Sequence, residues 1–350
     1  MKRLIICTTY SQLILAVQLK LTLFKEDLVD LWLSDTSKGA EFVYKNLKDI
    51  HLFQKVSYVK YQDFLYNQGV VKNLVDIVRF NFGLIREYPL YDEIIFYNLT
   101  LKIYEIADYY HKIDYNTKWS RFEEGIFSYN TDIAKSNRVA ITRMLRKFTN
   151  RPDVFILISR FYCVFPSLKD THKEWEFVAI PDFSVTISSL RDYLNHIFNY
   201  YPEKLNRYIY FASSSDIDKT PYGETNFVLK LADYVGKDNL LVKMHPRDNR
   251  SVYADYGIKV MENSYIPWEV IQMNIESSEC TFLTVNSGSF ISITAMLNKP
   301  VCGYFLYNSI KCFSATFTTR KNEIHNMLTK LHNIGVCKGI VDDIKDLEAL

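Results

Sequence analysis

The feature that most constrains how this chain folds is a repeated alternation of short apolar runs with amphipathic stretches. The run Leu4–Cys7 shows the pattern: it is continuously apolar, as in a parallel strand covered on both faces, and a polar turn leads from it into a helix that Ser11 can cap. Such alternation favours a parallel sheet with helices on both faces. In the first half, the expected strands are 4–7, 28–33, 56–59, 92–98 and 118–122, and the expected helices are 13–21, 40–48, 73–87 and 101–110.

The same alternation restarts after a middle stretch, so the sequence predicts two α/β domains. A chain of 350 residues is long enough for two domains with separate cores. Pro152 and Pro166 punctuate the middle stretch, and the boundary is expected within residues 152–185. In the second half, the expected strands are 207–211, 240–244, 280–285 and 300–304, and the expected helices are 227–235, 266–273 and 289–297. The assigned domains are 1–155 and 156–335, followed by a C-terminal helix at 336–350.

Composition and charge exclude some functions. Hydrophobic residues make up 48% and charged residues 23%, as in an ordinary globular protein. The net charge of +2 gives no electrostatic reason to expect nucleic acid as a partner. Of the six cysteines, none forms a CxxC pair, and Cys7, Cys280 and Cys302 lie in or beside apolar runs, where reduced thiols are expected. These features predict a cytoplasmic protein.

The N-terminus was tested as a signal or anchor because Lys2 and Arg3 precede the first apolar run. Polar residues interrupt that run, and no segment approaches the ~20 apolar residues that a membrane span requires. We therefore expect no secretion signal. The basic, amphipathic stretch 136–151 is compatible with peripheral contact to the inner face of the cell membrane, or with a solvated helix.

Two adjacent carboxylates follow the expected strand 118–122. Glu123 and Glu124 precede Gly125, and neighbouring side chains at a strand end diverge, so one carboxylate can face a cleft while the other braces the loop. A carboxylate partly shielded from water has a raised pKa and suits a base that takes a proton from a sugar hydroxyl. The alternative is a solvated acidic turn.

A histidine ends the expected strand 240–244. His245 is followed by Pro246, which stops the strand ladder and fixes the turn. A histidine in this position can donate to a phosphate or protonate a leaving group near neutral pH, and Lys243 and Arg247 add positive charge nearby. The alternative is a structural histidine.

Serine-rich turns follow two other expected strands. Ser287, Gly288 and Ser289 place hydroxyls and backbone N–H groups at a helix N-terminus, which is a natural seat for an anion. Ser213 and Ser214 offer the same chemistry after strand 207–211. Ordinary N-capping explains either turn equally well.

Two further acidic features are less specific. Glu269, in the first turn of a short helix, can accept hydrogen bonds from ribose hydroxyls or simply complement the helix dipole. Asp216-Ile217-Asp218 matches the DxD pattern of metal-dependent glycosyltransferases, but it lies in a polar loop and is too short to be specific. No GxxxxGK, GxGxxG or zinc-type Cys/His spacing occurs, so nothing favours a P-loop NTPase, a kinase or a dinucleotide dehydrogenase.

In combination and in this order, the acid-acid-Gly, His-Pro and serine motifs resemble those of bacterial sialyltransferases. The order and separation are most similar to glycosyltransferase family 52, the lipooligosaccharide and capsule sialyltransferases, and bacterial polysialyltransferases share the motifs. The opening Cys7–Gln12 is also similar to that family's first strand and loop. The resemblance implies a GT-B fold, with two Rossmann-type parallel-sheet domains facing each other across a cleft. It also implies CMP-sialic acid as donor, inversion at the anomeric carbon, and no metal or other cofactor.

The resemblance also implies roles for individual residues. Domain 1–155 would be the acceptor side, with Glu123 or Glu124 as the base, and domain 156–335 would bind the nucleotide donor. His245 would contact the CMP phosphate and assist its departure. The other implied donor-side residues are Pro246, Ser213, Ser214, Glu269, Ser287, Gly288 and Ser289, and the implied acceptor-side loop residues are Thr8, Thr9, Tyr10 and Gln12.

Two alternatives stay open. The same fold can use another donor, such as UDP-glucose or CDP-glycerol, or the chain can be a non-catalytic subunit of a glycan-assembly system. The partners expected on the favoured interpretation are a nucleotide-sugar donor and a terminal galactose-type acceptor on a bacterial surface glycan, with no nucleic acid.

Overall fold

The computed structural model divides the chain into two compact units, Met1–Pro181 and Asp182–Leu350, and each is described here by itself. We call them the first unit and the second unit. The structure describes every residue except 61–84, 130–142, 145, 169–173, 203–204, 214–222, 246–247, 249, 264, 276–279, 286, 298–301, 311–314, 334, 336–339 and 342–350.

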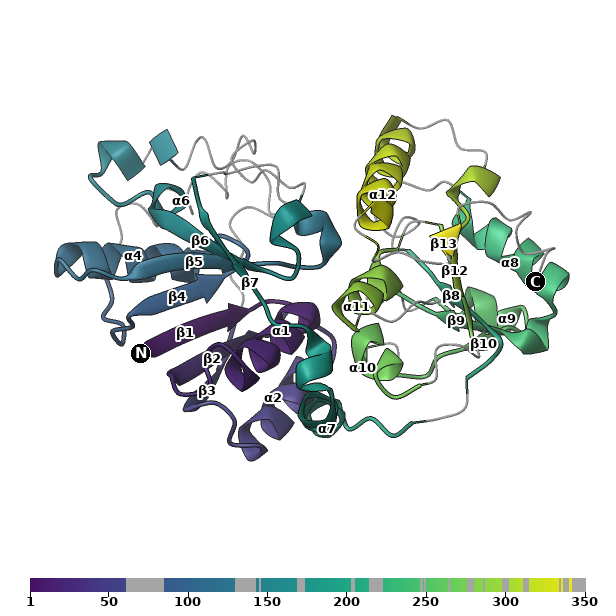
Figure 1. The fold of residues 1–350 in the computed structure, drawn as a ribbon, viewed down its shortest axis with the longest axis horizontal. Helices are drawn as coiled ribbons and strands as arrows, with labels where there is room; N and C mark the ends of the chain where they lie inside the picture. The colour runs from purple at the N-terminus through teal and green to yellow at the C-terminus, as the bar shows by residue number, and fades with distance from the viewer. Residues whose placement is uncertain are drawn as a thin grey trace. The chain divides into compact units, whose positions relative to one another are not determined.

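The first unit is built on a parallel sheet that, within the described residues, has seven strands in the order β3-β2-β1-β4-β5-β6-β7 (Figure 1). β1 lies in the middle of this sheet, and its residues from Leu4 to Cys7 are almost fully buried, as expected for a strand covered on both faces. The strands are β1 (Lys2–Cys7), β2 (Leu28–Ser34), β3 (Lys55–Val59), β4 (Glu93–Phe96), β5 (Lys118–Phe122), β6 (Ile158–Cys163) and β7 (Glu176–Ala179).

The helices of the first unit confirm the predicted alternation, with one correction at a helix start. They include α1 (Tyr10–Leu21), α2 (Ala40–Asp49), α4 (Leu101–Lys112) and the short α6 (Val154–Leu157). α1 is capped by Thr9, whose hydroxyl accepts from the Gln12 backbone N–H, and not by Ser11 as expected. The helix expected at 73–87 lies largely outside the described residues.

The first unit extends past the expected boundary at residue 155. β6 pairs with β5 and β7 pairs with β6, both in parallel, so the chain completes the first sheet before it leaves the unit at Pro181. The sequence pattern did not reveal these two strands, because Arg160 and Glu176 break their apolar runs; these residues form an ion pair across the two strands. The boundary at Pro181–Asp182 therefore lies within the expected range 152–185, but after the assigned domain end at 155.

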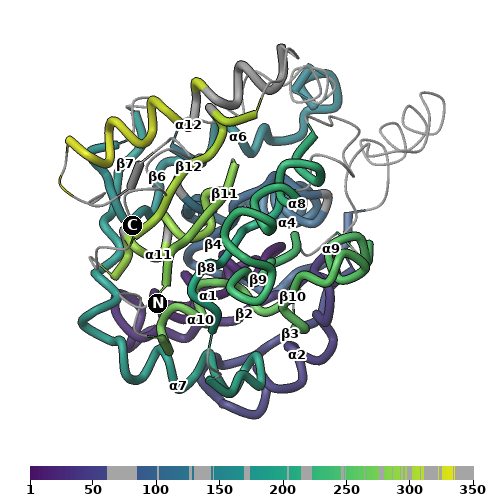
Figure 2. Tube along the Cα trace, turned by 90° about the vertical axis from the view of Figure 1, so that its right-hand side faces the viewer, coloured from purple at the N-terminus to yellow at the C-terminus, as the bar shows by residue number. Residues whose placement is uncertain are grey.

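The second unit holds a parallel sheet of six described strands in the order β10-β9-β8-β11-β12-β13. Figure 2 labels five of them, β8 to β12, and Figure 1 labels β13. Its strands are β8 (Tyr208–Phe211), β9 (Leu240–Lys243), β10 (Lys259–Val260), β11 (Thr281–Thr284), β12 (Cys302–Phe305) and β13 (Ile340–Val341). Its helices include α7 (Ile187–Phe198), α8 (Glu224–Val235), α9 (Val252–Asp255), α10 (Trp268–Gln272), α11 (Ser289–Leu297) and α12 (Ala315–Asn333).

An aromatic cluster fixes helices of the second unit to its sheet. The ring of Phe211 on β8 lies 4.8 Å from Trp268 of α10 and 5.6 Å from Phe290 of α11, between ring centroids. Gly303 on β12 is required by this packing, since a Cβ there would lie 2.6 Å from the Phe290 ring. The starts of α10 and α11 are thereby held at the carboxyl end of the sheet.

The described residues correct part of the expectation for the C-terminus. The expected C-terminal helix at 336–350 is wrong for Ile340–Val341, which form the edge strand β13; the rest of that range lies outside the description. In the parts that are described, no helix is long and apolar enough to cross a membrane.

Both sheets have a topological switch point, where the strand order reverses direction. It lies between β1 and β4 in the first unit and between β8 and β11 in the second. In open parallel sheets, ligands bind at the carboxyl ends of the strands beside this point. Each unit therefore carries one location at which its own functional residues are expected.

Candidate functional site

In the first unit, the loop after β1 forms one side of the switch point. Gln12 is fully buried, and its Oε1 accepts hydrogen bonds from the Thr8 backbone N–H at 2.7 Å and the Thr8 hydroxyl at 3.1 Å. These two donors fix the orientation of the Gln12 amide. Tyr10 donates from its hydroxyl to the Lys38 carbonyl at 2.6 Å and so ties the loop to the segment before α2.

Glu124 lies within reach of this loop, although it follows β5. Its carboxylate is half-buried and lies near the side chains of Thr9 and Gln12. Burial raises the pKa of Glu124 above its usual range, while these two polar side chains and the charge of Arg121 act in the opposite direction. The structure thus brings together three residues that the sequence analysis assigned to the acceptor side, from two loops more than a hundred residues apart.

Glu123 has a different environment from its neighbour. It is 1% exposed; its carboxylate accepts hydrogen bonds from the Tyr129 hydroxyl and, at 2.8 Å, from the Val164 backbone N–H. Burial raises the pKa of Glu123 to about 7, against the smaller lowering by these two donors. Gly125, at φ +67°, makes the sharp turn that lets the two carboxylates diverge. Glu123 braces the turn against the end of β6.

Arg121 is a buried cation beside the acidic pair, and sequence reasoning gave it no role. Its Nε donates to the Tyr97 carbonyl at 3.0 Å and its guanidinium lies 4.7 Å from the centre of the Tyr97 ring. Nη1 and Nη2 are buried and make no hydrogen bond to any described residue. Burial lowers the pKa of Arg121 to about 10, so the group stays cationic at neutral pH and its charge acts on Glu124.

In the second unit, Ser213 follows β8 on one side of the switch point. Its backbone N–H donates to Glu224 Oε1 at 3.0 Å, and its hydroxyl donates to the same carboxylate. Glu224 begins α8, is 2% exposed and also accepts from the Tyr210 hydroxyl at 2.8 Å. The sequence analysis gave Glu224 no role, because an acidic residue in the first turn of a helix is common. It fixes the Ser213 turn. Ser214 lies outside the described residues.

The serine loop, Ser287–Ser289, follows β11 on the other side of the same switch point. Thr284 links the two sides, because its hydroxyl donates to the Phe211 carbonyl and accepts from the Ser287 backbone N–H, both at 2.9 Å. The Ser287 and Ser289 hydroxyls lie 2.9 Å apart, and all three residues of the loop are half-buried. The loop presents hydroxyls at the start of α11, a nine-residue helix whose dipole has its positive end here.

His245 follows β9, next to the switch-point strand β8. It is half-buried; its carbonyl accepts from the Asp248 N–H at 2.8 Å, and the buried Asp248 forms an ion pair with Arg250. Lys243 does not point to solvent as a phosphate ligand would: it is buried, and its Nζ donates to the Ile266 carbonyl at 2.8 Å. Pro246 and Arg247 lie outside the described residues.

Glu269 lies close enough to Lys243 for their charges to interact. Burial lowers the pKa of Lys243 to about 8, and the charge of Glu269 acts against that lowering. Glu269 is 8% exposed. The Asp216-Ile217-Asp218 pattern and Asn286 fall outside the description. Among the residues that are described, no group of three or more His, Cys, Asp or Glu side chains could hold a metal ion.

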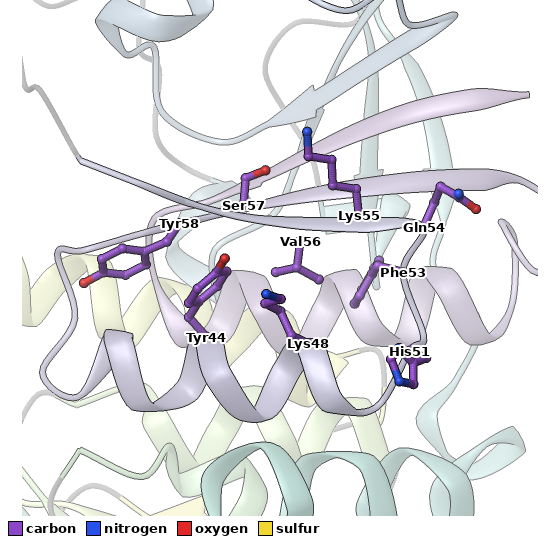
Figure 3. A pocket seen from close by; sticks show the side chains of 9 residues that line it. All are labelled: Tyr44, Lys48, His51, Phe53, Gln54, Lys55, Val56, Ser57 and Tyr58. Carbon is purple, nitrogen blue, oxygen red and sulfur yellow. The ribbon is translucent and has the colours of Figure 1, made fainter.

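A hollow of about 600 Å³ lies elsewhere in the first unit, between α2 and the edge strand β3. Figure 3 shows Val56 pointing toward α2, while Lys55 and Ser57 point away from it. No residue of the predicted site lines this hollow. Its lining is Tyr44, Lys48, His51, Phe53, Gln54, Lys55, Val56, Ser57 and Tyr58.

The two α/β units, each with a parallel sheet, have the GT-B type of fold that the sequence predicts, while the expected cleft between the units stays a prediction. An α/β-galactoside α-2,3-sialyltransferase from the luminous marine bacterium Photobacterium phosphoreum is similar in structure, with a TM-score of 0.51 and 10% identity, over 99% of this chain and 98% of that one. At the level of sequence, the chain belongs to the family described as gliding motility protein GldB, whose model matches residues 105–312, more than half of the chain.

A second solved structure supports the same fold. The UDP-GlcNAc 2-epimerase from Methanocaldococcus jannaschii has a TM-score of 0.50 and 12% identity, over 99% of this chain and 90% of that one. At such identities the likeness concerns the fold alone. No curated protein sequence matches the chain. The family match begins in α4 and includes the acidic pair, His245 and the serine loop; the loop after β1 lies before it.

Proposed function

We propose that this protein is an inverting, metal-independent sialyltransferase that moves sialic acid from CMP-sialic acid to a terminal galactose-type acceptor of a bacterial surface glycan. The proposal joins the motif resemblance to glycosyltransferase family 52 with the GT-B fold. One observation carries it: the half-buried Glu124 carboxylate follows β5, beside the switch point of the first sheet, and lies near the side chains of Thr9 and Gln12.

In the proposed reaction, Glu124 takes the proton from the acceptor hydroxyl as that oxygen attacks the anomeric carbon of sialic acid. The bond from this carbon to the CMP phosphate oxygen breaks, and CMP leaves with the electron pair. Since Glu123 is 1% exposed and already bonded by Tyr129 and Val164, Glu124 is the better candidate for a base that must touch substrate. Thr9 and Gln12 lie near the carboxylate and act to lower its pKa.

The second unit supplies the proposed donor site. Ser287 and Ser289, with the amino end of α11, would bind the CMP phosphate, and His245 would donate to it as it departs. Ser213 stands across the switch point from the serine loop and is held there by Glu224. A monophosphate leaving group carries less charge than a diphosphate, so these donors suffice without a metal.

The test has two parts. Thermal unfolding of the full chain is followed with CMP, UDP and CDP, and we expect CMP to stabilise the protein most. CMP release from CMP-sialic acid is then measured with and without lactose as acceptor, and we expect acceptor-dependent release. Equal stabilisation by UDP or CDP would move the proposal to UDP-glucose or CDP-glycerol as donor.

The family match favours a second candidate function. On this second candidate, the chain serves a motility or surface-assembly machine without catalysis, while keeping the GT-B fold. In that case none of the three nucleotides would shift the unfolding temperature, and no CMP would be released. The nucleotide experiment therefore separates the two functions before any acceptor is known.

A further inference from the structure

The outer side of β3 is a sheet edge that no other described strand covers. β3 stands at the end of the strand order of the first sheet and pairs with β2 on its inner side. Lys55 and Tyr58 are exposed although both belong to this strand, and Tyr58 is 37% exposed. A sheet edge presents a row of backbone N–H and C=O groups, so it can accept a further extended segment.

The backbone groups of Val56 and Tyr58 point to this outer side. The Val59 carbonyl accepts from the Asp35 N–H, just after β2, at 3.2 Å, so Val59 turns its backbone groups inward. Backbone groups along a strand point alternately to its two sides. Ser57 therefore also faces β2, while Val56 and Tyr58 each present one N–H and one C=O outward.

The hollow between α2 and β3 runs along the same edge. Every residue from Phe53 to Tyr58 lines it, so it follows the strand for its whole length. In Figure 3, Tyr44 and Lys48 extend from α2 toward β3, and Val56 points back toward the helix. The rings of Tyr44 and Tyr58 lie 5.4 Å apart, between centroids. A volume of about 600 Å³ is typical of natural ligand sites.

The cationic side chains of the hollow have no acidic partner in the described part of the chain. The lining includes Lys48, His51 and Lys55, and it includes no Asp or Glu. Both lysines are exposed, and Lys48 lies over the Tyr44 ring at 5.7 Å. Neither lysine forms an ion pair with a described residue. Lys48 and Lys55 place positive charge on the two sides of the edge, because Lys55 points away from α2 (Figure 3).

These lysines decide which strand the edge can accept. Lysines on an edge disfavour indiscriminate strand pairing. A second copy of the chain would bring the same lysines together, and like charges on paired strands are destabilising. A segment with carboxylates would instead oppose Lys48 and Lys55 with opposite charge. Asp35 and Glu41 act on Tyr58 at the other end of the hollow, so the acidic part of the segment belongs beside Lys55.

We propose that the outer edge of β3 binds an extended, acidic segment of a partner protein, which adds to the first sheet as a further strand. Its backbone pairs with the outward N–H and C=O groups of Val56 and Tyr58. Its side chains on one face enter the hollow, and its carboxylates face Lys48 and Lys55. In strand addition of this kind, main-chain hydrogen bonds give the affinity and side-chain pockets give the selectivity. The inference does not depend on the proposed transfer reaction.

The test measures, by fluorescence anisotropy, binding of the full chain to a short labelled peptide that alternates glutamate with valine. We expect saturable binding that weakens as salt is added, since exposed charges are screened. The same peptide with lysine in place of glutamate should not bind. Methylation of every amide nitrogen of the acidic peptide removes its backbone donors and should abolish binding.

Val56→Pro is the sharpest change in the protein, because it removes one outward N–H and leaves the hydrogen bonds of β3 to β2 in place. Affinity for the acidic peptide should fall about tenfold or more. Lys48→Glu should also weaken binding. Lys45→Glu is its matched control, since Lys45 is exposed on the same helix but does not line the hollow, and it should leave affinity unchanged.

Thermal unfolding establishes that each variant is folded, and the two lysine variants carry the test if Val56→Pro does not fold. Absence of binding by the acidic peptide, or equal binding by the lysine peptide, would overturn the proposal. Unchanged affinity in both Val56→Pro and Lys48→Glu would also overturn it, because the peptide would then bind elsewhere. A concentration-dependent dimer that Val56→Pro abolishes would assign the edge to a second copy instead.

Discussion

The two units place chemically opposite loops at the carboxyl edges of similar sheets. In the first unit, the turn after β5, one strand away from the switch point, carries two carboxylates, Glu123 and Glu124. In the second, the turn after the switch-point strand β11 carries two hydroxyls and a half-buried helix start, Ser287–Ser289. Each lies at the carboxyl edge of a parallel sheet near its switch point. The fold therefore provides the location, and the residue types decide which chemistry it can support.

Burial acts on both loops, but with different results. Removing water from a carboxylate raises its pKa, which makes Glu123 and Glu124 better proton acceptors than exposed acids. Removing water from hydroxyls and helix N–H groups leaves them neutral donors suited to an anion. On the proposed function, proton transfer belongs to the first unit and phosphate binding to the second, and the following changes test that proposal.

The largest effect is expected for Glu124→Gln. The amide keeps the shape of the side chain and its contact with Thr9 but cannot accept a proton. We expect transfer to fall by about 10²- to 10⁴-fold, the range for loss of a general base, with donor binding nearly unchanged. CMP release in the presence of lactose measures the first quantity, and CMP-induced thermal stabilisation measures the second.

Glu123→Gln is the matched control, since it makes the same change one residue away in a side chain that is 1% exposed. Its transfer rate should fall much less. If the two variants lose transfer equally, the distinction between a reacting and a bracing carboxylate is wrong. If neither loses it, the acidic pair is not the site of proton transfer.

The next largest effect is the contribution of Glu123 to the pH dependence of the free energy of unfolding. Its folded-state pKa is raised from 4.5 to about 7, so the folded protein binds this proton more tightly than the unfolded chain. The resulting stability is fully present below pH 4.5 and is lost as pH rises through about 7. At most about 3 kcal/mol is involved. Urea unfolding at about pH 5 and about pH 8 should show the wild type losing stability relative to Glu123→Gln. Parallel pH dependence in the two proteins would contradict this.

A smaller effect is expected in the serine loop. Ser287→Ala and Ser289→Ala each remove one hydroxyl from the proposed phosphate site while leaving the helix N–H groups. We expect CMP affinity to fall about tenfold, as for the loss of one hydrogen bond to a charged group. Calorimetry with CMP measures this. Ser251→Ala, which removes an exposed serine hydroxyl at the start of α9, is the control and should not change affinity. Unchanged affinity in both loop variants would remove the serine loop from the donor site.

Much of this fold could be predicted from the sequence because central parallel strands are continuous apolar runs. β1, β5 and α11 lie within a residue or two of their expected positions. β6 and β7 could not be predicted in the same way, because near the sheet edge they carry charged residues such as Arg160 and Glu176, which satisfy each other across the strands. The spacing of apolar residues along the chain does not reveal such ion pairs.

The site was predictable only in part. Motifs at strand ends indicated Glu124, His245 and the serine loop as candidates, since strand ends in parallel sheets meet at one edge, and their roles stay predictions. Spacing alone could not distinguish Glu123 from Glu124, because the difference comes from Tyr129 and the Val164 N–H, which contact only the former. Nor could it reveal Glu224 or Arg121, whose roles depend on partners distant in sequence.

The smallest effect, and the sharpest test of the first unit, concerns Arg121. Its charge lowers the pKa of Glu124 from a distance, without a hydrogen bond from its own Nη1 or Nη2 to any described residue. Arg121→Met removes the charge but keeps an unbranched apolar chain against Tyr97. Without the charge, the pKa of Glu124 should rise further, so that the base is protonated over a wider range. We expect the acid limb of the pH–kcat profile to move to higher pH by about one unit, with little change in the plateau at high pH.

Arg121→Lys keeps the charge and should leave the limb in place. A purely structural Arg121 would instead lower kcat at every pH in the Met variant without moving the limb, and Glu124 would then owe its ionisation to Thr9 and Gln12 alone.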